Sequence, residues 1–129
     1  MTLDELYTQV TDAISRAEAH AAERHAREAA IAFYEVSRLE ERIAELLPAS
    51  DPEGALARQG VVTAALAAGD VMRALERAQF YLKEQGLSPS FRAELAALLV
   101  DAEETLRRLP GGGEPLVVPV HFTLVLRAA

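Results

Sequence analysis

The stretch of sequence that decides the fold is residues 57–82, which read ARQGVVTAALAAGDVMRALERAQFYL. Apolar side chains recur at spacings of three and four on both sides of Gly69-Asp70, and that spacing is typical of helices. Glycine ends a helix readily and aspartate begins one, so Gly69-Asp70 indicates a tight break with Asp70 capping the next helix. We therefore predict two helices, one over about 52–68 and one beginning after Asp70 and ending at Gly86. The many alanines favour close contact between the two.

Helix-start signals flank this hairpin on both sides. Upstream, Ser50 and Asp51 are candidate N-caps, Pro52 suits a first turn, and Ser50 with Glu53 reads as a capping box. Downstream, Ser88-Pro89 predicts a helix that Pro110 stops. Its apolar positions are Phe91, Leu95, Leu98, Leu99, Ala102 and Leu106.

The first third of the chain has a helical pattern that neither proline nor glycine interrupts between residues 3 and 47. Thr2 and Glu5 form a capping-box signature at its start, and Pro48 ends it. The apolar positions are Leu6, Val10, Ile14, Ala17, Phe33, Val36, Leu39, Ile43 and Leu47. We predict one long helix of about 65 Å, the alternative being a break near 17–22. A helix of that length overhangs a compact bundle, which favours a homodimer.

Near the end of the chain, the spacing of apolar residues changes from three or four to two. Gly111-Gly112-Gly113 is a flexible sequence, so residues 111–114 are predicted to be a glycine-rich tether after a helical domain at 1–110. Residues 115–127 then alternate in the manner of a β-strand, with Pro119 suited to a strand start or an edge. The apolar face of this predicted strand, and our predicted partner-binding set, is Val118, Val120, Phe122, Leu124 and Leu126.

A single strand leaves its backbone groups unpaired and shows one apolar face. Three arrangements satisfy it. Two copies of the tail pair across a dimer axis or exchange onto each other's bodies; the tail joins the sheet of another protein; or its apolar face lies on the helices of its own chain. We favour the first, with the apolar face also packed on helices, because an isolated two-stranded ribbon is marginally stable.

Part of the chain resembles the tetratricopeptide repeat. The matching residues in 57–82 are Ala64, Ala65, Gly69-Asp70 and Ala74-Leu75. A 34-residue step, the period of that repeat, carries Val61 to Leu95, Val62 to Ala96 and Ala65 to Leu99. The family's bulky aromatic residue in the first helix is absent, and about one and a half repeats fit within 52–108. The resemblance implies helical hairpins and a role in protein interaction, with no chemistry. A generic helical hairpin with alanines at the contact shares these features.

Residues suited to catalysis or metal binding are few. The chain has no cysteine and three histidines, His20, His25 and His121. On one continuous helix, His20 and His25 are five apart and do not share a face. Glu28 follows His25 by three, so two copies of the pair across a dimer would supply four ligands. A helical-bundle metal-binding enzyme or ligand sensor, with its site at a dimer interface, is therefore the alternative function.

Charge and hydropathy limit the class of partner. The net charge of −7 argues against a binder of nucleic-acid phosphates. Arg73 and Arg77 are one turn apart and are expected on a solvated helix face, while Arg107 and Arg108 complement a helix C-terminus. No segment reaches the length of apolar residues that a membrane helix needs, and the acidic N-terminus lacks a signal core. We expect no membrane association and a cytoplasmic location.

Together these patterns predict an all-α fold, namely an antiparallel helical bundle or tetratricopeptide-like hairpins with a long N-terminal helix and one C-terminal β-strand. The predicted function is a non-catalytic protein–protein interaction or adaptor module without a cofactor or metal. It would self-associate or dock a partner through its C-terminal strand and its helical surface.

Overall fold

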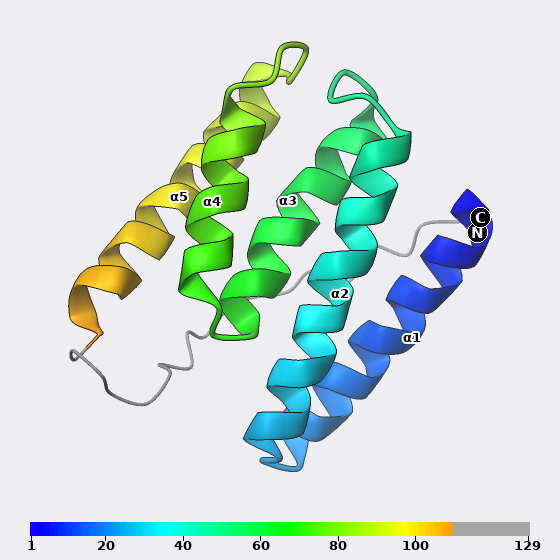
Figure 1. Cartoon of the computed structure of the whole chain (residues 1–129), viewed down its shortest axis with the longest axis vertical. Coiled ribbons are helices and arrows are strands. Elements are labelled where there is room, and N and C mark those ends of the chain that lie inside the picture. Colours follow the sequence, from blue (N-terminus) through cyan, green and yellow to red (C-terminus); the bar gives the residue numbers. More distant parts are fainter. Residues whose placement is uncertain (110–129) are drawn as a thin grey trace.

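The computed structural model describes residues 1–109, and this part of the chain consists of helices joined by short turns (Figure 1). The helices are α1 (Leu3–Ala22), α2 (Ala26–Leu46), α3 (Pro52–Ala67), α4 (Val71–Leu82) and α5 (Pro89–Arg108). The all-α prediction is confirmed for these residues. The predicted tether and strand, residues 111–127, lie outside the described residues. None of the five helices is long and apolar enough to cross a membrane.

The helices stand in a row in which successive helices run in opposite directions (Figure 1). Each packs against its neighbour in the chain, and α5 also reaches back to contact α3. Helices α1 and α5 therefore form the two ends of the row. The predicted antiparallel arrangement is what the structure has.

Helix α3 lies at the centre of the core and is buried on most sides. Its side chains are small, which lets α2 and α4 approach its backbone closely. On the α2 side, a Cβ atom at Gly60 would lie 2.9 Å from Cδ of Glu40, and at the turn before α3 a Cβ atom at Gly54 would lie 2.1 Å from the carbonyl oxygen of Pro48. The buried residues of α3 are Gly54, Ala55, Ala57, Arg58, Val61, Val62, Ala64, Ala65 and Leu66.

Most helix starts follow the predicted capping chemistry. Thr2 accepts a hydrogen bond from the Glu5 backbone N–H in a complete capping box, and the side chains of Asp70 and Ser88 cap α4 and α5. The α3 cap is Asp51, whose carboxylate accepts from the Glu53 N–H. The capping box predicted for Ser50 is therefore wrong. Helix α4 also ends at Leu82, before the predicted stop at Gly86.

The predicted long helix over 3–47 is wrong, because the chain reverses at Glu23-Arg24-His25. Arg24 adopts the left-handed conformation, with φ of 62°. The His25 N–H donates to the His20 carbonyl at 2.8 Å and the Arg24 N–H to the Ala21 carbonyl at 3.1 Å. These are the two bonds of a Schellman motif. Glycine usually fills the left-handed position of that motif, so arginine gave no signal in the sequence.

The reversal folds α1 onto α2 and removes the overhang from which we predicted a dimer. Burial of two apolar stripes drives it, because Leu6, Val10 and Ile14 on α1 face the α2 side of the core, where Val36 and Ile43 are buried. Any case for self-association now depends on the tail and on the surface of the helices.

The strained turn can be tested with glycine. Replacing Arg24 with glycine should raise the free energy of unfolding by about 1 kcal/mol, because glycine adopts positive φ without a steric penalty. The matched control is Arg42→Gly on the exposed side of α2, which should lower it by about 1 kcal/mol. Chemical denaturation measures both. Destabilisation of equal size in the two variants would show that the reversal is not at Arg24.

Candidate functional site

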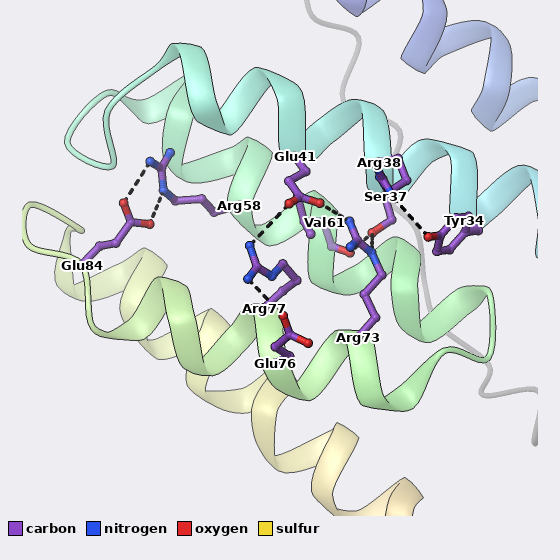
Figure 2. Close-up of polar contacts among 10 residues, drawn as sticks. All are labelled: Tyr34, Ser37, Arg38, Glu41, Arg58, Val61, Arg73, Glu76, Arg77 and Glu84. Carbon is purple, nitrogen blue, oxygen red and sulfur yellow. Dashed lines mark hydrogen bonds and ion pairs between the residues drawn. The ribbon is translucent and has the colours of Figure 1, made fainter.

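The principal polar cluster of the described residues joins α2 to α4 across α3, with Glu41 at its centre (Figure 2). The Glu41 carboxylate accepts from Arg73 Nη2 at 2.6 Å and lies 3.4 Å from Arg77 Nη1. All three side chains are largely covered, with exposed fractions of 22% for Glu41, 15% for Arg73 and 18% for Arg77. One carboxylate on α2 therefore holds two consecutive turns of α4.

A buried hydroxyl extends the cluster into α3. Ser37, on α2, is fully buried; its Oγ donates to the Val61 carbonyl at 2.7 Å and accepts from Arg73 Nε at 2.9 Å (Figure 2). The guanidinium of Arg73 thus contacts both Ser37 and Glu41, which lie one turn apart on α2. We call Ser37, Glu41, Arg73 and Arg77 the interhelix cluster.

The interhelix cluster corrects a prediction. Arg73 and Arg77 were expected on a solvated face, yet both point across to α2 and are mostly buried. The signal was present in the sequence as two pairs at matching spacing, Ser37 with Glu41 and Arg73 with Arg77. It could not be interpreted from sequence alone, because either pair would look the same on a helix exposed to solvent.

A second ion pair ties the end of α4 to α3. Arg58 is buried, and its Nε and Nη2 donate to the two carboxylate oxygens of Glu84 at 2.7 and 3.2 Å. Its Nη1 donates to the carbonyls of Leu47 and Gly54 at 3.0 and 2.9 Å. A bidentate guanidinium with all its bonds inside the protein serves to fix the ends of α2, α3 and α4 relative to one another.

Between the interhelix cluster and Arg58 lies an open hollow of about 300 Å³. Its lining includes Glu45, Phe80 and Tyr81 besides the charged residues already described. Phe80 is half exposed, and the Arg77 guanidinium sits 4.7 Å from the centre of its ring. The two arginines that line the hollow pair with carboxylates that also line it, Arg77 with Glu41 and Arg58 with Glu84.

Tyr81 lines the hollow and has a raised pKa. Burial of the phenol and, to a smaller extent, the neighbouring Glu41 carboxylate raise its pKa to about 12, because both disfavour the phenolate anion. Arg77 and Arg58 oppose the rise in pKa. Tyr81 therefore stays neutral at physiological pH and packs as an aromatic residue in the wall of the hollow.

The histidines lie at the α1–α2 turn, on either side of Arg24. Their Nδ1 atoms are 3.5 Å apart, and His25 Nδ1 is 3.4 Å from the Glu23 carboxylate. The Schellman motif explains the contact, since it brings the residues at these two positions together. His20 and Glu28 also line one surface hollow of about 230 Å³ between α1 and α2. In residues 1–109 no group of three or more His, Cys, Asp or Glu side chains is placed to hold a metal ion.

The predicted partner-binding residues Val118, Val120, Phe122, Leu124 and Leu126 all lie outside the described residues, as does His121. The chain matches no family model, no curated protein and no solved structure. The resemblance to the tetratricopeptide repeat accordingly stays a prediction.

The interhelix cluster can be tested by removing its central carboxylate. Glu41→Ala should lower the free energy of unfolding by about 2 kcal/mol, because it leaves the mostly buried guanidinium of Arg73 without a carboxylate and leaves Arg77 with only the exposed Glu76. Glu45→Ala, one turn further along α2 and exposed, should change it by less than about 0.5 kcal/mol. Urea denaturation of both variants measures the difference. Equal effects would mean that Glu41 contributes no more than a surface carboxylate.

The raised pKa of Tyr81 predicts a pH dependence of stability. The folded state holds this proton more tightly than the unfolded state, so the stabilisation is complete below pH 10 and is lost as the pH rises towards 12. Tyr81→Phe should remove that part of the alkaline loss. The free energy of unfolding of the native protein and of the variant is measured from pH 9 to 12. If the two curves stay parallel, the raised pKa of Tyr81 is contradicted.

Proposed function

We propose that this protein is a non-catalytic interaction or adaptor module that binds protein through its helical surface and its C-terminal strand, with a second copy of the chain as the leading partner. The observation that carries the proposal is the number of large apolar side chains left exposed on the helices. On α4 and α5, Met72 is 63% exposed, Val100 49% and Leu106 40%, and on α2 Ile31 and Leu46 are exposed as well. Apolar surface that gathers into a patch is typical of interaction sites.

The polar residues of the described helices support a structural role. Arg58, Arg73 and Arg77 each hold a carboxylate from another helix or turn. Their bonds join α2, α3 and α4 into a rigid support, which is what an interaction module needs beneath its binding surface. A reactive site would instead need some of these groups aimed at a substrate.

The resemblance to the tetratricopeptide repeat supports the same function. Helices α3 and α4 form a hairpin whose turn has Gly69 at φ of 77° and Asp70 as the cap of α4. Helix α5 then packs on both members of the hairpin. That is the order of contacts expected if α5 corresponds to the first helix of a following repeat.

The proposal is tested by removing the tail. A chain ending at residue 110 should show a lower mass in light scattering and should lose the partners that the full chain retains in pull-down. Phe122→Ser with Leu124→Ser should act in the same direction, because it removes the middle of the apolar face. The matched control is His121→Ser with Thr123→Ser on the opposite face, which should leave mass and partners unchanged. Retention of both by the truncated chain would refute the proposal.

A further inference from the structure

The helices at the two ends of the row, α1 and α5, differ in how much apolar surface they expose. On α1 the large apolar residues Leu6, Tyr7, Val10 and Ile14 are all buried, and its outer side is polar. Helix α5 has the same length, yet Leu95 and Ala102 are its buried residues. An end helix whose outer side is polar closes a row of helices, whereas one with exposed apolar residues leaves the row open.

Apolar residues of α5 lie along one side of the helix. Leu106 is exposed and shares a helix face with Leu99, seven residues earlier, which is half-buried and packs against the core, and the exposed Val100 extends that face outwards. Ala96, one turn before Val100, is exposed as well. We call Ala96, Leu99, Val100 and Leu106 the α5 strip; the exposed Glu103 lies within it.

The α5 strip ends close to the point where the tail begins. Because α4 and α5 are antiparallel, the start of α4, with its exposed Met72, lies at the same end of the row as the last turn of α5 (Figure 1). The chain continues from Leu109 at this end. Whatever segment follows Leu109 therefore starts beside uncovered apolar surface.

The tail is long enough to reach the strip and to cover it. Eight residues separate Leu109 from Val118, and these nine steps span up to about 30 Å. From Val118 to Leu126 an extended chain covers about 27 Å, whereas the strip from Ala96 to Leu106 is about 15 Å long. A tail that turns back at the glycines can therefore cover the whole strip and continue along α5 beyond it.

We propose that the α5 strip is the docking site for residues 115–127 of the same chain, which lie along it with Val118, Val120, Phe122, Leu124 and Leu126 turned inwards. A connection as short as residues 110–117 would keep the tail at an effective concentration near millimolar, so the tail would bind its own α5 in preference to that of other copies at ordinary protein concentrations. The inference rests on the proposed function, in which the tail is a docking element, and it adds that the apolar face of the tail packs on α5.

This placement also specifies the partner. With its apolar face on α5, the docked strand keeps its backbone N–H and C=O groups free along the edge. An extended segment of another chain pairs with such an edge by β-augmentation. The docked tail of a second copy is such a segment, so two modules would join strand to strand with both apolar faces covered.

Because the chain has no cysteine, disulfide cross-linking tests the docking directly. Val100→Cys is combined in turn with cysteine at Val120, His121, Phe122, Thr123 or Leu124 in the full-length chain, which is oxidised at micromolar concentration. Disulfides form only between close Cα atoms. The rate should be highest at one of positions 120, 122 and 124 and about tenfold lower at the neighbouring 121 and 123, and the product should be an internal disulfide of the monomer, given the local concentration of a tethered segment.

The control pairs the same tail positions with Thr8→Cys on the exposed side of α1. Cross-linking there at the rates found with Val100→Cys, or rates that do not alternate along the tail, would overturn the inference. Alternating disulfides that link two chains would overturn it too, because the occupant would then be the tail of another copy.

The outcome is separable from that of the proposed function. In one outcome, the disulfides of the monomer alternate along the tail while truncation at residue 110 leaves mass and partners unchanged. That result would support the docking site and refute the interaction role. If truncation lowers the mass or removes partners but the disulfides to Val100→Cys do not alternate, the interaction role is supported and the docking site is refuted.

Discussion

The structure depends on the close packing of α3 between α2 and α4. Helix α3 can occupy the middle of the row because its buried side chains are mostly alanine and valine, and because Gly54 has no side chain where the helix meets the Pro48 carbonyl. A larger residue at this contact would push α3 away from the turn that precedes it. Close approach then sets the distance over which Ser37 reaches the Val61 carbonyl and Arg73 reaches Glu41.

The polar bonds add direction to this packing. Small apolar residues allow helices to slide and rotate against one another, because their contacts are not directional. The interhelix cluster and the bidentate pair of Arg58 with Glu84 have fixed geometry, so they select one arrangement of α2, α3 and α4. Arg92 fixes the connection between α4 and α5 in the same way. Its guanidinium donates to the carbonyls of Leu82 and Glu84 at 2.7 and 2.9 Å, which holds the start of α5 against the end of α4. The hollow lies beside these bonds, and Glu41, Arg58, Arg77 and Glu84 form part of its lining.

The proposed interaction role is based on the surface that the row of helices leaves uncovered. Helix α1 closes one end with a polar surface, whereas α5 exposes an apolar strip at the other. The strand predicted from the sequence has an apolar face, and the α5 end of the row exposes apolar side chains, so the two features are complementary. The loss of the overhanging first helix sharpens this view, because it moves the expected contact from the start of the chain to its end.

The sequence by itself determined the helix-forming segments, the Gly69-Asp70 turn and the caps at Thr2, Asp51, Asp70 and Ser88, because capping bonds join residues two or three apart. Tertiary structure decided the reversal at Arg24 and the partners of Arg73 and Arg77. Arginine tolerates a left-handed conformation there because burying α1 against α2 outweighs the local strain, and that burial involves residues far apart in the sequence. Glu41 and Arg73 are 32 positions apart, so their pairing exists only once α3 has brought α2 and α4 together.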